Sequence, residues 1–146
     1  MGPKRKNLRD AIAVLATGLI AASFAVPAFN GYLQRSRVTR AVSDIGTMSL
    51  QLHRWQRDGR TLPASLAEAG IALVDPWGRP YVYLRAADAS RAQLRKDGEL
   101  VPLNTDFDLY SLGPDGMSSL SLPAAPSRDD VVRAANGAYI GVASNY

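Results

Sequence analysis

Carboxylates are the residues best suited to chemistry in this chain, and three of them gather near its C-terminus. Asp115 lies in a Gly-Pro-Asp-Gly sequence, and the pair Asp129 and Asp130 follows a Ser- and Pro-rich loop at residues 117–128. Carboxylate oxygens suit Ca²⁺, and an ion held between turn and pair would offset the entropy of ordering that loop. The residues alone favour a plainer interpretation, with Asp115 as a turn residue and Asp129 as a helix N-cap.

Side chains typical of catalytic sites are scarce. His53 is the one histidine, and its place between Leu52 and Arg54 is more typical of a surface or interface residue than of a general base. The sequence has no cysteine, so it contains neither a thiolate metal site nor a cysteine nucleophile. It also has no Gly-rich phosphate loop and no paired metal-ligating histidines. The sequence therefore predicts that the chain is not an enzyme.

The net charge of +4 is concentrated at the N-terminus, where Lys4, Arg5, Lys6 and Arg9 face only one acidic residue, Asp10. The rest of the chain is close to neutral. Its basic character is thus a flank rather than a patch the size of a nucleic-acid groove. We expect no nucleic-acid partner.

An uncharged segment follows the basic flank, from residue 11 to residue 34. Its apolar part, residues 11–29, would span roughly 28 Å as a helix, close to the hydrocarbon thickness of a bilayer. The basic flank predicts a single pass through a membrane, with residues 1–10 in the cytoplasm and the remainder outside. Gly18 and Ala22 have the small-xxx-small spacing that lets helices approach closely.

Other interpretations of the apolar segment remain open. One is a secretory signal cleaved after Ser23-Phe-Ala25. A second is a buried helix of a soluble protein, and a third is a permanent anchor with no role in assembly.

The sequence after the apolar segment argues against simple cleavage, because it continues in helical register from Leu33 to about Arg57. Apolar residues recur every three or four positions, at Val38, Val42, Ile45, Met48, Leu52 and Trp55. We expect one helix of about 45 residues with a kink at Pro27, ended by Asp58-Gly59.

The remainder predicts a small sheet. We expect a loop at residues 60–75 with a short helical piece at 63–69, strands at 81–84 and 106–112, a hairpin tip at 96–99 and a turn at 113–116. Residues 129–146 give no clear prediction. The predicted fold class is α+β, with a long N-terminal transmembrane and spine helix packed on a small antiparallel sheet. We expect a basic leader-like segment at 1–10, a transmembrane half-helix at 11–34, and a globular domain at 35–146 that includes the amphipathic half of the helix.

Several short sequence motifs, called phrases below, occur in a characteristic order. They are Val26-Pro-Ala-Phe29, Asp75-Pro-Trp-Gly-Arg-Pro-Tyr81, Asp108-Leu-Tyr-Ser-Leu-Gly-Pro-Asp-Gly116 and Asp129-Asp-Val131. In this order the chain resembles the type IV pilin superfamily, and most closely the major pseudopilin of type II secretion systems, over about residues 8–135. The two middle phrases are the more specific part of the likeness.

The resemblance implies a filament in the bacterial cell envelope, in which apolar half-helices pack into a central bundle and secretion is driven by adding subunits. Residues 11–34 would then lie in the inner membrane before they enter the filament core, and the domain at 35–146 would be periplasmic. Its partners would be copies of the chain, other pseudopilins, an inner-membrane assembly platform and membrane lipid. The resemblance also implies a structural Ca²⁺ site. By position, its ligands would be the backbone carbonyl of Leu112 and the carboxylates of Asp115, Asp129 and Asp130.

The N-terminus departs from the family pattern. Pilin-like precursors usually have a Gly just before a Phe-led mature helix, with a Glu shortly inside it. Counting back from Pro27, these positions hold Arg5, Lys6 and Asp10. Asp10 can still pair with the N-terminus of a neighbouring subunit, but the sequence does not predict cleavage by prepilin peptidase or N-methylation.

We therefore expect a structural subunit of a pseudopilus, with Asp10, Gly18, Ala22 and Pro27 as its assembly residues. The rival hypothesis is a membrane-anchored periplasmic binding module that does not polymerise. Such a module would expose Trp77, Tyr81 and Tyr83 to a ligand, whereas a pilin-like domain would bury them against the long helix.

Overall fold

A computed structural model describes residues 8–90, 92–98 and 101–146 of the chain. In the long helix, the side chains of residues 8–14, 16–22, 24 and 25 lie outside this description. The chain divides into two units, Met1–Ser36 and Arg37–Tyr146.

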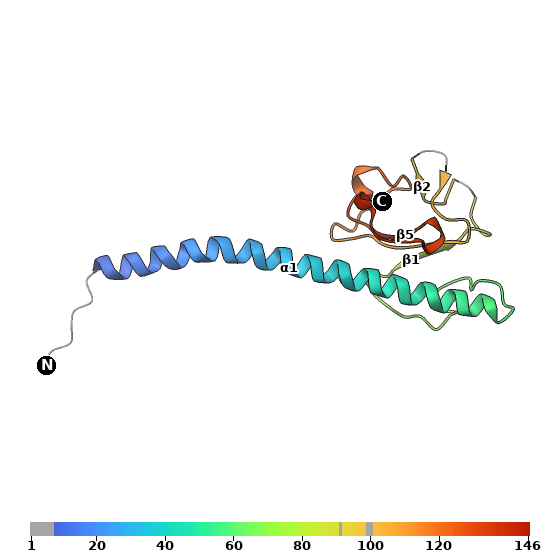
Figure 1. Cartoon of the computed structure of the whole chain (residues 1–146), viewed down its shortest axis with the longest axis horizontal. Coiled ribbons are helices and arrows are strands. Elements are labelled where there is room, and N and C mark those ends of the chain that lie inside the picture. Colours follow the sequence, from blue (N-terminus) through green and yellow to red (C-terminus); the bar gives the residue numbers. More distant parts are fainter. Residues whose placement is uncertain (1–7, 91, 99–100) are drawn as a thin grey trace. The chain divides into compact units, whose positions relative to one another are not determined.

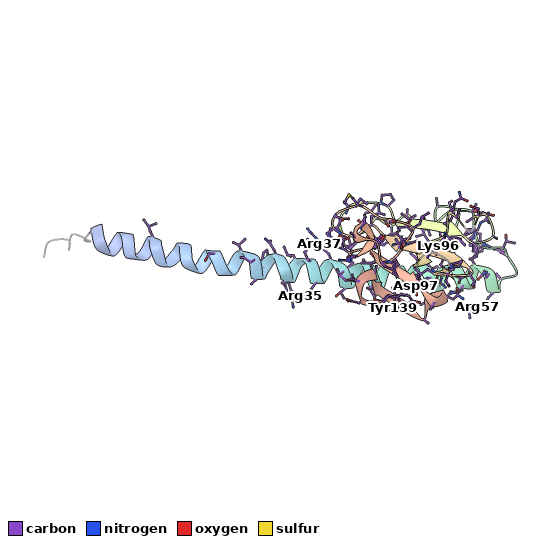
Figure 2. All side chains as sticks on the ribbon, turned by 90° about the horizontal axis from the view of Figure 1, so that it is seen from above. Arg35, Arg37, Arg57, Lys96, Asp97 and Tyr139 are labelled. Carbon is purple, nitrogen blue, oxygen red and sulfur yellow. The ribbon has the colours of Figure 1, made fainter. Side chains whose placement is uncertain are left out.

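The long helix α1 runs from Leu8 to Arg57, a length of 50 residues, as one continuous ribbon (Figure 1). The helix continues through Pro27 without a break. It ends where the sequence predicts, because the next residues form a turn and Gly59 adopts a positive φ of 76°. Within the part of the chain that the structure describes, no helix has both the length and the apolar character needed to cross a membrane. The predicted span at 11–34 falls largely on residues whose side chains are outside the described set.

Four short strands of the second unit form an antiparallel sheet in the order β1-β4-β5-β6 (Figure 1). Their bounds are β1 Val82–Arg85, β4 Phe107–Ser111, β5 Val131–Ala134 and β6 Tyr139–Val142. A separate hairpin pairs β2 Lys96–Asp97 with β3 Val101–Pro102. Three 3-10 turns complete the unit: η1 Ala125–Ser127, η2 Ala135–Gly137 and η3 Ala143–Asn145.

The predicted α+β class, with one long helix and a small antiparallel sheet, is confirmed. The apolar stripe of α1 forms the core of the second unit, since Ile45, Met48 and Leu52 have no exposed surface. They belong to one cluster with Phe107 and Leu109 of β4. The strands expected near 81–84 and 106–112 and the hairpin near 96–99 are all present.

Residues on the two sides of β5 enter different clusters. Val131 joins the cluster that contains α1, and its neighbour Val132 joins a second cluster with Leu103 and Leu122. Successive side chains of a strand point to opposite faces. The sheet is therefore covered by the helix on one face and by loops on the other.

The short helix predicted at 63–69 is absent, and the structure has turns there. The segment does contain helix-starting bonds, because Glu68 accepts from the backbone N–H of Ala64 at 2.5 Å and Ser65 Oγ accepts from that of Glu68 at 3.2 Å. Gly70 follows at a positive φ of 71°, so the chain turns away before a second helical turn can form.

Candidate functional site

The two phrases that carry the family resemblance are joined by the buried carboxylate of Asp75. One of its oxygens accepts from the backbone N–H groups of Trp77 and Arg79, at 3.0 and 2.8 Å. The other accepts from the hydroxyl of Ser111 at 2.6 Å. Ser111 Oγ in turn accepts from the backbone N–H of Gly113 at 3.1 Å. One side chain thus shapes the turn before β1 and fixes it to the end of β4.

The turn at 113–116 is the predicted one, and two predicted calcium ligands meet there. The Asp129 carboxylate accepts from the backbone N–H of Asp115 at 3.2 Å. The carboxylate of Asp115 is exposed and accepts from the backbone N–H of Met117 at 2.7 Å. The Leu112 carbonyl accepts from Gly116 N–H at 3.2 Å.

A guanidinium lies on the same turn. Arg79 donates to the carbonyl of Gly113, and its Cζ is 2.9 Å from the position that a Cβ on Gly116 would occupy. This positive group therefore lies beside the carbonyl-rich side of the turn.

Asp130, another predicted ligand, is paired with a cation of the chain itself. It has no exposed surface, and its Oδ2 lies 2.7 Å from Nη1 of Arg95, whose side chain is 2% exposed. Ser118 Oγ donates to the same oxygen at 2.6 Å. Burial raises the pKa of the Asp130 carboxyl, because lost hydration outweighs the favourable contacts from Ser118 and Arg95.

The predicted ligands do not form a calcium cage in this arrangement. Within the described residues, no group of three or more acidic or histidine side chains is placed to hold a metal ion. Asp115 and Asp129 accept backbone N–H groups, and Asp130 faces Arg95 instead of the turn. Calcium binding stays a prediction that the resemblance makes.

A second buried arginine, which the sequence did not single out, connects the sheet to α1. Arg133 of β5 pairs with Asp106 at 2.6 Å, and its Cζ lies 4.0 Å above the ring of Phe107. His53 is a neighbour of this cluster, with Nε2 at 3.4 Å from Arg133 Nη2, and thus lies at a contact between helix and sheet. Burial opposes the charge of Asp106, but hydrogen bonds from Arg133 and from the backbone of Phe107 outweigh it and lower the pKa.

The aromatic side chains that a binding module would expose are packed instead. Tyr81 is 5% exposed and donates to Asp44 of α1 at 2.9 Å. Tyr83 donates to the carbonyl of Pro63 at 2.9 Å, and Trp77 packs against the main core cluster. Burial, followed by the hydrogen bond to Asp44, raises the pKa of Tyr81. Burial raises the pKa of Tyr83 to about 12.

The residues predicted for assembly all fall in α1. Pro27 is exposed and lies inside the helix. The side chains of Asp10, Gly18 and Ala22 lie outside the described residues, so their contacts stay predictions.

Comparison with known proteins gives one match of limited extent. The ribosomal RNA large subunit methyltransferase M of Alkalilimnicola ehrlichii (strain ATCC BAA-1101 / DSM 17681 / MLHE-1) is 33% identical over 98 residues, which cover 67% of this chain and 27% of that protein. The chain therefore spans about a quarter of the length of this relative. No protein-family model matches the chain, and no solved structure matches it.

This match corrects one prediction. The relative is named as a methyltransferase, which contradicts the sequence-based prediction that the chain is not an enzyme. That prediction rested on missing local motifs. Such motifs detect only those active sites whose residues are close together in the sequence, and they miss sites that the fold assembles from distant residues.

Proposed function

We propose that the chain is a structural subunit of a pseudopilus-like filament in a type II secretion-type machine. In this proposal residues 11–34 hold it in a bacterial inner membrane, the N-terminus is cytoplasmic and the domain Arg37–Tyr146 is periplasmic. The apolar half of α1 lies first in lipid and then in a bundle of neighbouring copies.

The supporting observation is a contrast along α1. In the second unit the apolar stripe of α1 forms the core, with Ile45 and Leu52 0% exposed, and Leu50 lies outside that stripe and is exposed. In the first unit four of the described large apolar side chains are exposed, Leu15 by 67%, Val26 by 58%, Phe29 by 60% and Tyr32 by 67%, and a fifth, Leu33, is half-buried. Soluble proteins rarely leave such a series uncovered, so an apolar surrounding, either lipid or other helices, fits this half of the helix.

The apolar segment is also suited to leaving a membrane. Its large apolar residues each contribute only about −0.3 to −0.6 kcal/mol of insertion free energy, a total on the order of −2 to −5 kcal/mol. Gly18 and Ala22 would allow close packing between copies, which replaces the lost lipid contacts with helix contacts.

The structure of the second unit adds support for the resemblance. The phrase at residues 75–81 and the phrase at 108–116 belong to one hydrogen-bonded unit through Asp75, Ser111 and Gly113. Motifs that depend on each other physically are stronger support for a shared fold than two unrelated short matches.

Disulfide crosslinking tests the proposal directly, because the chain has no cysteine of its own. The full-length variant carrying both Leu15→Cys and Phe29→Cys is oxidised in native membranes and analysed on a non-reducing gel. In a filament each helix contacts neighbours at offset heights, so we expect a ladder that extends beyond the dimer.

The matched controls are the two single-cysteine variants, which can form no product larger than a dimer. Mixing them in one cell adds a second test, since offset packing predicts heterodimers between positions 15 and 29. A double variant that yields only dimers through identical positions would contradict the filament and favour the anchored module.

The relative supports a second candidate function, methyl transfer to large-subunit ribosomal RNA, because that activity is in its name. Purified full-length protein would be incubated with ribosomal RNA and a radiolabelled methyl donor. Label in the RNA above that of a heat-denatured control would support this second function. The crosslinking result stands independently of that outcome.

A further inference from the structure

Side-chain hydrogen bonds join the two ends of the loop between β4 and β5. Ser119 lies near the start of the loop and Ser127 near its end. The hydroxyl of Ser127 accepts from the backbone N–H of Ser119 and donates to the backbone carbonyl of Ser119, both at 2.9 Å. One step further out, Ser118 donates to the carboxylate of Asp130 at 2.6 Å. These bonds supplement the two other anchors of the loop, the buried side chain of Leu122 and the backbone bonds between Lys96 and residues 120 and 122.

Arg95 is the cation at the centre of this closure. Its Nη1 contacts both Asp130 Oδ2, at 2.7 Å, and Ser118 Oγ, at 3.0 Å. Its Cζ lies 4.2 Å from the ring centre of Tyr110, a cation–π position. The guanidinium thus joins the start of the loop, the end of the loop and strand β4.

The backbone of Arg95 is fixed as firmly as its side chain. Its N–H donates to the buried carboxylate of Asp108 at 2.8 Å, and its carbonyl accepts from the N–H of Leu103 at 2.7 Å. These backbone bonds place Arg95 where its side chain can reach Asp130, so forming the pair costs only the rotamer freedom of that side chain.

A divalent cation fits poorly beside these groups. Asp130 Oδ1 is buried without a hydrogen-bond partner, which by itself would favour an added cation. However, Nε and Nη2 of Arg95, on the other side of the ion pair, are also buried without a hydrogen-bond partner. An ion drawn to that oxygen would meet the positive charge of Arg95, and one at the turn would meet Arg79 beside Gly116.

We propose that Arg95 takes the place of a calcium ion in this chain, so that an internal guanidinium closes the loop between β4 and β5. The domain then folds and keeps its stability without calcium. This inference concerns the domain alone, and its test is independent of whether the chain forms filaments.

The test is thermal unfolding of the full-length protein in detergent, measured in EGTA and in millimolar CaCl2. For the unaltered chain we expect midpoints that agree within about 1 °C, since no ion is part of the fold. Stabilisation by calcium of more than about 5 °C would overturn the proposal.

Substitutions identify the group that closes the loop. Arg95→Met leaves Asp130 buried without its counter-charge and should lower the midpoint by more than about 10 °C. Adding Asp130→Asn to that variant should recover part of the loss, because the uncompensated charge is then gone. A double variant no more stable than Arg95→Met would contradict the pairing. Arg40→Met is the matched control, because this arginine is 71% exposed and its 3.9 Å ion pair with Asp44 is worth little.

A milder variant keeps the test decisive if Arg95→Met does not fold. Ser118→Ala removes two hydrogen bonds, the one it donates to Asp130 and the one it accepts from Arg95, but retains the ion pair between them. We expect a loss of about 5–12 °C that is equal in EGTA and in calcium. A loss that calcium restores would show that an ion holds the loop, and would overturn the proposal.

Discussion

Replacing Asp75 by alanine should be among the most damaging single changes in the second unit. The carboxylate is 3% exposed and is the acceptor for two backbone N–H groups and one hydroxyl. Alanine removes all of these bonds at once. It leaves the N–H groups of Trp77 and Arg79 without the acceptor that shapes their turn.

The size of the effect follows from these contacts. A bond to a charged acceptor contributes about 1.5–3 kcal/mol, and an unsatisfied buried donor costs about 1–3 kcal/mol. The turn can relax and water can reach part of it, so we expect a loss of about 3–5 kcal/mol in the free energy of unfolding. Asp75→Asn keeps the acceptor for both N–H groups and disturbs only the bond from Ser111, so about 1–2 kcal/mol should be lost.

Urea unfolding of the full-length protein in mild detergent, followed by tryptophan fluorescence, measures both losses. Both tryptophans, Trp55 and Trp77, belong to the second unit, so the signal reports on that unit. Asp88→Ala is the control, because this exposed carboxylate pairs with Arg85 at the surface and should cost less than about 1 kcal/mol. The reasoning is refuted if Asp75→Ala costs no more than the control, or if Asp75→Asn costs as much as Asp75→Ala.

Three further changes test the packing, the turn and the pH dependence. Leu52→Ala should cost about 2–5 kcal/mol in the same assay and Leu50→Ala, at an exposed position, less than about 1 kcal/mol; equal losses would contradict the assigned face of α1. Gly113→Ala should cost at least about 2 kcal/mol, because its φ is 63° and a Cβ would collide with the carbonyl of Asp129, whereas Gly78→Ala meets no atom within 4 Å and should cost only about 1 kcal/mol. A Tyr83 pKa raised to about 12 means that the unfolded chain releases this proton first, so its contribution to stability is complete below about pH 10 and is lost as the pH rises towards 12. Absorbance of tyrosinate should show this late titration, and Tyr83→Phe should weaken the alkaline loss of stability; an unchanged alkaline profile would argue against it.

The elements whose apolar residues recur at a regular spacing were predictable from the sequence. The apolar residues of α1 recur every three or four positions, and the helix buries that stripe. The strands β5 and β6 gave no such signal. All four residues of β5 are buried, and those of β6 are all partly buried, so neither strand shows the alternation that marks a half-buried strand. Between them Asn136 takes a positive φ of 55°, which sequence patterns do not predict.

The candidate site was predictable only in part. The turn at 113–116 follows from local sequence, whereas the meeting of Asp115 with Asp129 was implied only by the family resemblance. The partner of Asp130 does not, because Arg95 lies in a polar stretch that reads as loop and reaches Asp130 only through the tertiary fold. The resemblance therefore predicted a set of carboxylates, but neither it nor the local sequence predicted the guanidinium that neutralises one of them.

Electron microscopy of the envelope fraction from cells that overproduce the full chain is the most direct measurement of the proposed function. The account predicts thin filaments of regular helical repeat that an antibody against the second unit labels along their length. Membranes that contain the protein in quantity, shown by immunoblot, but carry no labelled filaments would contradict it.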